Sequence, residues 1–175
     1  IDREGLVALQ NNHTYSADHS VYEVGGAGLN SAITFARQGI KAGCVARTGK
    51  DYLANQIKIV QKFEGLEPEL SINNPEHHTD MNIHIVTDRA SEIIIDYENS
   101  NNSLKSKDFK YPDLTTRILY LAELPADFKL FKYLVNWAML SGAQLYLNIT
   151  DIKNYRNRQI NYVLSVAQNI MMPMR

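Results

Sequence analysis

The sequence predicts an α/β protein with a parallel sheet. Strand-like and helix-like segments alternate along the chain, which is the pattern of such folds. Two continuous apolar runs, Ile118–Ala122 and Leu145–Ile149, have the length and composition of buried parallel strands. The most informative stretch is Ser20–Asp51, where a strand pattern, a glycine-rich turn, a helix pattern and a second strand pattern follow one another.

The glycine-rich turn is the first candidate for a binding site. The strand expected over Ser20–Val24 runs into Gly25 and Gly26, and Gly39 ends the helix expected over Ser31–Gln38. Glycines accept positive φ angles and let a ligand approach the main chain closely. The N-terminus of the helix behind them offers unpaired N–H groups and the positive end of the helix dipole. We therefore expect a polar ligand beside this turn.

The other elements follow from periodicity and from turn signals. Met81–Thr87 and Glu92–Tyr97 alternate around a short polar loop, which predicts a β-hairpin. Asp51 has the position and chemistry of an N-cap for the helix that follows it. The remaining expected elements are a loose strand over Tyr15–Val24, a strand over Ala42–Ala46, helices over Tyr52–Glu64, Phe128–Leu140 and Ile160–Ile170, and a connector over Leu66–Pro75.

The composition limits the classes of function. A chain of 175 residues is long enough for one domain with a real core. Its 18 basic and 19 acidic residues give a net charge of −1, which argues against a nucleic-acid partner. No apolar run is long enough to span a bilayer and no signal peptide is visible, so we expect a cytoplasmic protein without a membrane partner. The single cysteine, Cys44, lies in an apolar run and is expected to be a buried thiol.

Polar side chains follow the carboxyl ends of the expected strands, where ligands bind in parallel α/β sheets. Carboxylates and an amide around a glycine-lined crevice suit a ligand with several hydroxyl groups. Structural alternatives stay open, because Asn30 and Asp51 also fit helix caps and Glu123 also fits an exposed charge. The candidate substrate-binding residues are Asp2, Gly25, Gly26, Asn30 and Glu123.

Two other kinds of site fit less well. Gly26-x-Gly28-x-x-Ser31 resembles a degraded dinucleotide fingerprint, but the next strand ends in Arg47-Thr48-Gly49 where an acidic residue is required. A group of potential metal ligands surrounds the start of the hairpin, although adjacent histidines in a strand point to opposite faces. This group comprises His77, His78, Asp80 and His84.

Several motifs together resemble the PfkB (ribokinase-like) family of sugar and nucleoside kinases. GGAGLNSAITFARQG is similar to the N-terminal signature of that family, and VARTGKD is similar to its following strand and turn. The hairpin, ILYLAELP and LYLNITD extend the resemblance over roughly Ile1–Pro173. The short insert SADHSVYEVGG is similar to the nucleoside-directed branch, which includes pseudouridine kinases.

The resemblance implies a three-layer α/β/α fold with a small β-sheet lid, formed by about residues 13–24 and 81–97. It also implies transfer of the ATP γ-phosphate, with Mg²⁺, to a hydroxymethyl group of a sugar or nucleoside. Asp2, Gly26 and Asn30, together with Glu123, are then expected to hold sugar hydroxyls. Ala27 departs from the lysine found there in some ribokinases. Lids of this family often pair between subunits, so a homodimer through the hairpin is expected.

The second signature of that family, D-T-x-G-A-G-D, has no counterpart in the sequence. Because both ends of the chain look cut, we expect a single incomplete domain over residues 1–175, with the catalytic base beyond Arg175. The full-length protein is expected to use ATP and Mg²⁺, while this stretch alone is expected to need no cofactor and to be inactive as a kinase. The alternatives are a non-catalytic, pseudokinase-like binding module and, third, a fragment of a dinucleotide-binding oxidoreductase.

Overall fold

A computed structural model describes residues 10–67, 70–87, 92–97, 104–109, 115–149 and 156–172. These residues form a mixed α/β structure in which most helices alternate with strands. The elements in chain order are α1 (Ala27–Arg37), β1 (Arg47–Thr48), α2 (Tyr52–Phe63), β2 (Ile72–Asn73), β3 (Met81–Val86), β4 (Glu92–Tyr97), η3 (Ser106–Asp108), β5 (Ile118–Leu121), α3 (Phe128–Ser141), β6 (Gln144–Asn148), α4 (Asn157–Val166) and β7 (Asn169–Met171).

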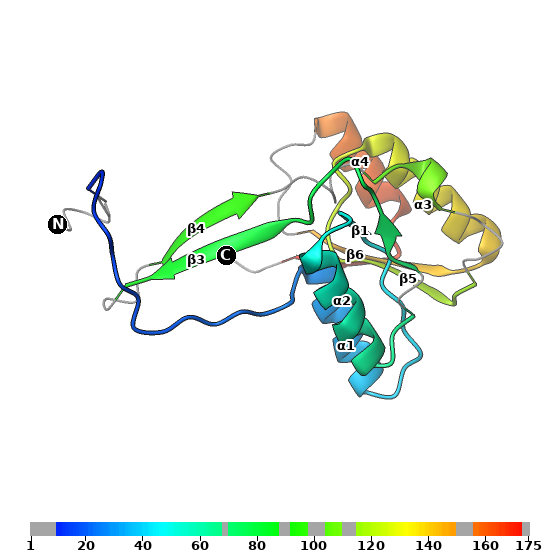
Figure 1. Ribbon diagram of the computed structural model, residues 1–175. Helices are drawn as coiled ribbons and strands as arrows, with labels where there is room; N and C mark the ends of the chain where they lie inside the picture. Colours follow the sequence, from blue (N-terminus) through cyan, green and yellow to red (C-terminus); the bar gives the residue numbers. More distant parts are fainter. Residues whose placement is uncertain are drawn as a thin grey trace.

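The described strands form three small sheets. β1 pairs with β2 in parallel, β5, β6 and β7 form a parallel sheet in that order, and β3 and β4 form an antiparallel hairpin. The helices gather in a body, from which the hairpin projects to one side (Figure 1). The parallel sheet and the hairpin confirm the expected α/β class.

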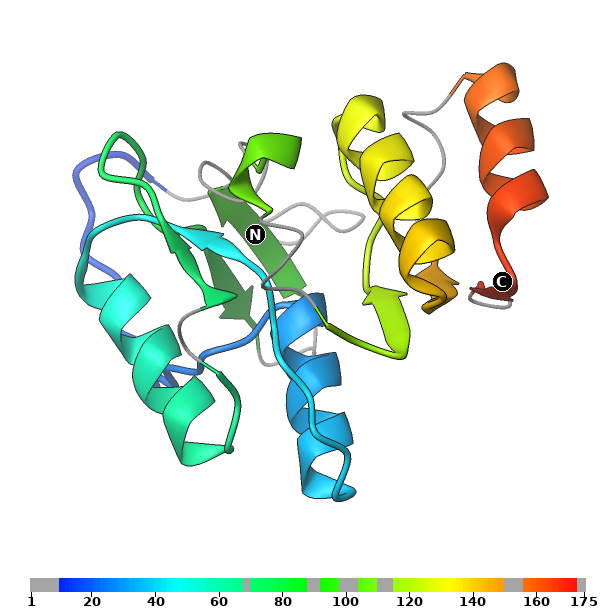
Figure 2. The ribbon, with the colours of Figure 1, turned by 90° about the vertical axis from the view of Figure 1, so that its right-hand side faces the viewer.

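The larger core lies between the three-stranded sheet and the helices α3 and α4, which stand side by side in Figure 2. Every second residue of β6 points into this core, since Leu145 and Leu147 are buried and their neighbours are not. Asp127 begins α3 by accepting a hydrogen bond from the N–H of Lys129, and Gly142 ends it at φ 72°. The buried members of this core are Leu121, Leu130, Phe131, Leu134, Val135, Leu145, Leu147, Ile149 and Val163.

A smaller core lies beside α1 and α2. Leu29 and Ala32 of α1 are buried with Cys44 and Leu66, which confirms the buried position expected for the thiol. On the surface, α1 and α2 are linked by an ion pair in which the Nε of Arg37 donates to Oε2 of Glu64 at 2.8 Å. These contacts fix the orientation of the helix that follows the glycine turn.

Two of the expected strands are wrong in position. The strand expected over Tyr15–Val24 is absent, and the segment that contains these residues runs without a ladder up to α1. Residues 42–46 also form no strand, because the parallel ladder begins only at Arg47, whose partner is Ile72. In both segments the side-chain pattern fits a strand, but no ladder forms there, and only the carbonyl of Ala46, which accepts from the N–H of Ile72 at 2.8 Å, joins the pairing that starts at Arg47.

Two strands were not expected at all. The connector predicted over residues 66–75 contains β2, which pairs with β1 over two residues. The helix expected over residues 160–170 is α4, which ends at Val166, and Asn169–Met171 then forms the edge strand β7 beside β6. Short strands such as these are placed by their partners, which local sequence does not encode.

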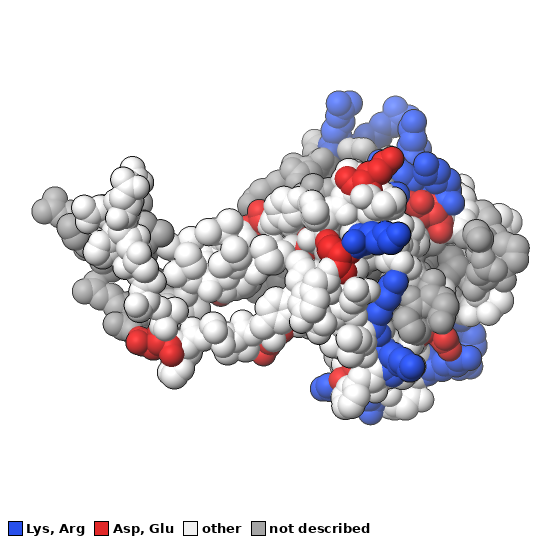
Figure 3. Space-filling model, viewed as in Figure 1, with Lys and Arg blue, Asp and Glu red and all other residues white. Residues whose placement is uncertain are grey.

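The hairpin has one apolar face. Its register places Met81 opposite Tyr97, Ile83 opposite Ile95 and Ile85 opposite Ile93, so these six side chains share one side. Four of them are at least 39% exposed. On the face shown in Figure 3, charged side chains gather over the helical body, and the projecting part of the molecule is mostly uncharged.

Candidate functional site

The glycine turn before α1 has the geometry that a main-chain binding site requires. Gly26 is the N-cap of α1 with φ 105°, a conformation that side chains rarely adopt, so a glycine is needed there. The N–H of Asn30 donates to the carbonyl oxygen of Gly26 at 2.9 Å and closes the first helical turn. Among the described residues, no side chain caps this helix. The first N–H groups of α1 are therefore left to a ligand or to solvent.

Asn30 lies directly over the turn. A Cβ atom built on Gly25 would lie 3.8 Å from Nδ2 and 3.9 Å from Oδ1 of Asn30. The side chain of Asn30 is exposed and therefore accessible to a ligand. The structure thus brings together three of the expected binding residues, Gly25, Gly26 and Asn30.

A pocket of about 310 Å³ lies between α1 and β5, and Asn30 forms part of its wall. Phe35 and Tyr120 also line the pocket, and their rings meet edge to face with centroids 5.6 Å apart. Ser31 and Thr34 line it too, while their hydroxyls donate to carbonyl oxygens one turn back in α1. The lining of the pocket therefore combines an amide and two hydroxyl-bearing residues with two aromatic rings.

Glu123 lies two residues after Leu121, the last residue of β5, and is exposed. Because Tyr120 of the same strand lines the pocket, β5 leads directly from the pocket to Glu123. Asp2, the fifth expected binding residue, lies outside the described residues. The structure therefore relates Glu123 to the pocket through its strand and leaves Asp2 untested.

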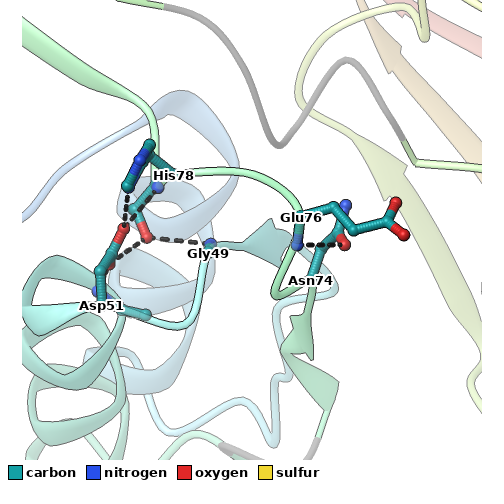
Figure 4. A network of polar contacts seen from close by, with 7 residues as sticks. Gly49, Asp51, Asn74, Glu76 and His78 are labelled. Carbon is teal, nitrogen blue, oxygen red and sulfur yellow. Dashed lines mark hydrogen bonds and ion pairs between the residues drawn. The ribbon is translucent and has the colours of Figure 1, made fainter.

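Asp51 caps α2, as its N-cap interpretation predicts. Its Oδ1 accepts a hydrogen bond from the N–H of Ala54 at 2.9 Å. The same carboxylate also accepts two hydrogen bonds from Thr79, one from its N–H and one from its hydroxyl. Figure 4 shows the network around Asp51 and Gly49. Because all of these donors converge on it, the carboxylate serves the fold.

The charge of Asp51 is set by opposing effects. Desolvation, the largest of them, raises the pKa of this carboxyl group, while the hydrogen bonds from Thr79 and Ala54 and the nearby His78 lower it. The balance holds the pKa below its ordinary value of 3.8. Asp51 is therefore a carboxylate at neutral pH, which is the form that accepts these hydrogen bonds.

The histidines near the hairpin make separate contacts. Nδ1 of His78 lies 3.8 Å from Oδ2 of Asp51, and Nδ1 of His84 lies 2.5 Å from Oε1 of Glu92. In the part of the chain that the structure describes, no group of three or more His, Cys, Asp or Glu side chains is arranged to hold a metal ion. No helix in that part is long and apolar enough to cross a bilayer.

Some residues of the site were not expected from the sequence. Phe35 fits the apolar face predicted for its helix, but nothing in the sequence indicates that Tyr120 would meet it across 85 positions. Thr79 likewise lies 28 positions from Asp51. Such pairings depend on how β5 and the β2–β3 connector are placed in the fold, so only the local part of the site could be predicted.

Comparison with known proteins identifies the family. Residues 2–160 match the model of the pfkB family of carbohydrate kinases, and this match covers well over half of the chain. No curated protein gave a significant match to the sequence. The matched range includes the glycine turn, β5 and Glu123.

Solved structures show the same fold. A fructokinase with bound ATP from Xylella fastidiosa is 16% identical with a TM-score of 0.73, and the alignment covers 83% of this chain and 50% of that one. 2-Dehydro-3-deoxygluconokinase from Thermotoga maritima is 13% identical with a TM-score of 0.70, and the alignment covers 85% of this chain and 50% of that one. A putative ribokinase II from E. coli is 12% identical with a TM-score of 0.73, and the alignment covers 93% of this chain and 57% of that one. The chain thus spans about half the length of these structures, and it is a ribokinase-like member of the pfkB family of carbohydrate kinases.

Proposed function

We propose that this chain carries the acceptor-binding part of a kinase that transfers the γ-phosphate of ATP to a hydroxymethyl group of a sugar or nucleoside. The observation that carries the proposal is the family match over residues 2–160. The geometry supports it, because the Gly25–Gly26 turn, the open N-terminus of α1 and the Asn30 amide lie together, and Asn30 lines a pocket with Ser31 and Thr34.

In this proposal the chain's own groups bind and orient the acceptor. The carboxamide of Asn30 donates to and accepts from neighbouring hydroxyls, and the main chain at Gly26 allows the ligand a close approach. The carboxylates of Asp2 and Glu123 accept hydrogen bonds from further hydroxyls. ATP with Mg²⁺, bound by the full-length protein, supplies the phosphoryl group and neutralises its charge during transfer.

We further propose that residues 1–175 alone bind the acceptor without phosphorylating it. The sequence contains no counterpart of the D-T-x-G-A-G-D signature that supplies the catalytic base and anion hole in this family. Phosphoryl transfer depends on positioning and charge neutralisation at the phosphates, for which this stretch lacks that signature. Phosphorylated product from the isolated chain and ATP–Mg²⁺ would contradict this part of the proposal.

The test is a thermal-shift screen of the purified chain with fructose, ribose, adenosine, uridine and pseudouridine, and separately with ATP–Mg²⁺ and NAD. A ligand that binds only the folded state raises the melting temperature by mass action. We expect a shift with one class of sugar or nucleoside and none with ATP or NAD. Asn30→Ala should abolish that shift. Asn136→Ala, the same change at an exposed position of α3, is the matched control and should keep it.

A second candidate is a non-catalytic, pseudokinase-like binding module that has the same fold and lacks the ATP-binding half. The coding sequence beyond Arg175 separates the two, because a downstream G-A-G-D indicates an enzyme. Acceptor binding in the screen is compatible with both candidates, whereas ATP turnover by the full-length protein is compatible only with the kinase.

We also propose that the β3–β4 hairpin serves as the lid of the site and as a contact between two copies of the chain. Its six-residue apolar face is self-complementary, since the antiparallel register repeats apolar pairs along its length. Ile83 is 46% and Ile95 is 50% exposed, so a second hairpin has apolar surface to cover.

Sedimentation of two variants tests the dimer. Ile83→Lys places a charge on the apolar face and should convert a dimer to a monomer, because a buried unpaired charge opposes association. Ile94→Lys is the matched control, since Ile94 is 49% exposed and lies on the opposite face of the same hairpin. A wild-type chain that sediments as a monomer at all concentrations would contradict the proposal.

A further inference from the structure

A polar junction joins the root of the hairpin to the start of α2. Thr79, two residues before β3, is 4% exposed and donates its N–H to Oδ2 of Asp51 at 2.8 Å and its hydroxyl to Oδ1 at 2.7 Å. The N–H of Gly49 in turn donates to the hydroxyl oxygen of Thr79 at 3.0 Å. The turn that begins α2 and the root of the hairpin are thus fastened to one another (Figure 4).

The fastening is also sterically tight. A Cβ atom on Gly49 would lie 2.5 Å from the carbonyl oxygen of His77 and 2.7 Å from the nitrogen of Thr79. Both are main-chain atoms, so a side chain at this position cannot be accommodated without moving the root of the hairpin. The close approach of the two backbones is therefore part of the junction.

Beyond this junction the hairpin packs chiefly on itself. Among the described elements, β3 and β4 contact each other far more than either contacts any helix or strand of the body. Next to the junction lies an open cavity of about 390 Å³. Its walls come from the start of α2 and from the first pair of the hairpin, Met81 and Tyr97. The hydrogen bonds of the junction therefore hold the root of the hairpin on one side of this open cavity.

We propose that Asp51 is the positioning residue of the hairpin, acting through its two hydrogen bonds to Thr79 at the root of β3. In this arrangement the carboxylate sets the angle at which the hairpin leaves the body. The proposal rests on the proposed function for its purpose, since a lid must be aimed at the Asn30 pocket to close over an acceptor. The junction itself is independent of that function.

Spin-label distances between the hairpin and the body test the proposal. The labels are attached through Val86→Cys on β3 and Leu140→Cys on α3, which replace side chains that are 67% and 86% exposed. Unlabelled chain is added in excess so that only distances within one chain contribute. In the otherwise wild-type protein we expect one narrow distance distribution.

Three variants then separate the two roles of Asp51, which are its hydrogen bonds to Thr79 and its capping of α2. Asp51→Asn keeps an oxygen for capping α2 but replaces the acceptor of the Thr79 N–H, and Thr79→Val removes the hydroxyl. Loss of a hydrogen bond to a charged group shifts an equilibrium by about tenfold or more, so both should broaden or shift the distribution. Asp127→Asn, at the N-cap of α3, is the matched control and should leave it narrow.

Each outcome decides a separate claim. A broadened distribution for both Asp51→Asn and Thr79→Val, restored in Thr79→Ser, supports the proposal. Unchanged distributions in folded Asp51→Asn and Thr79→Val overturn it. If the distributions broaden but no sugar or nucleoside binds the chain, the proposed function falls and the positioning role stands. If an acceptor binds and the distance distribution is the same in the wild type and in both variants, the function stands and the positioning role falls.

Discussion

The glycines of this chain have unequal roles, and their surroundings decide which of them tolerate a side chain. At Gly49 a Cβ would lie within 2.7 Å of two main-chain atoms, whereas at Gly28, inside α1, it would meet only Sγ of Cys44 at an ordinary 3.7 Å. We expect Gly49→Ala to lower the free energy of unfolding by about 1–3 kcal/mol through overpacking. Gly28→Ala should raise it by about 0.5 kcal/mol, since alanine is the better helix former.

Urea unfolding of the two glycine variants checks this prediction. Both replace a glycine by the same residue, so they differ only in the surroundings of the new methyl group. Equal destabilisation by the two substitutions would show that the close backbone approach at Gly49 is not formed in the protein.

Cys44 offers a probe of the smaller core. Burial raises the pKa of its thiol to about 11, because desolvation disfavours the thiolate. We expect no reaction with a thiol reagent at neutral pH in the native protein and complete reaction in urea. Fast modification of the folded chain would show that α1 does not cover this residue.

The pH dependence of stability reports on Asp51. The folded state holds the pKa of this carboxyl below its ordinary value of 3.8, so folding favours the charged form. Its contribution to stability is therefore complete above the ordinary pKa and is lost as the pH falls below 3.8 through the lower folded pKa. We expect the wild type to exceed Asp51→Asn in stability near neutral pH and the difference to shrink in acid. Urea melts across this range measure it, and a constant difference would be inconsistent with the lowered pKa.

At the scale of single residues, the sequence predicted only contacts between residues that are close along the chain. Asp51 could be assigned as an N-cap because the helix pattern starts at the next residue, and the bond to Ala54 confirms it. Its partner Thr79 could not be found in this way, since it lies 28 positions away in a segment without a pattern of its own. Gly25, Gly26 and Asn30 were predictable together because one turn of chain joins them.

Among the elements, α2 and α3 differ in how their aromatic residues are used. Phe131 of α3 is fully buried, and Phe63 of α2 is 86% exposed although it shares helical spacing with other apolar residues. We expect Phe131→Ala to cost about 3–5 kcal/mol of unfolding free energy and Phe63→Ala less than about 0.5 kcal/mol. Denaturant unfolding of both variants provides the comparison, and a large loss for Phe63→Ala would mean that another surface covers α2.

The elements that sequence predicted well are those with strong local signals. The helices α1, α2 and α3 each end next to a glycine, and the hairpin alternates with a polar loop between its strands. β1, β2 and β7 were misplaced or missed, because two or three residues carry too little pattern to define a strand. Their positions follow from the registers they adopt with β6 and with each other.

At the scale of the whole molecule, the parts of the site come from distant segments. The glycine turn leads into α1 of the smaller core, while Tyr120 of the pocket lies on β5 at the larger core and Glu123 follows that strand. The hairpin is fastened at the start of α2. In the proposed kinase an acceptor placed over Asn30 contacts all three, so its binding should stiffen the arrangement of the body and hairpin.

The most direct test of this account is an NMR titration of the isotopically labelled chain with the acceptor that the thermal screen identifies. We predict that the largest amide shifts fall on Gly25, Gly26 and Asn30, with smaller shifts along the hairpin and almost none on the exposed face of α4. Shifts confined to surfaces away from the glycine turn, or none at saturating sugar and nucleoside, would contradict the assignment of this turn as the acceptor-binding site.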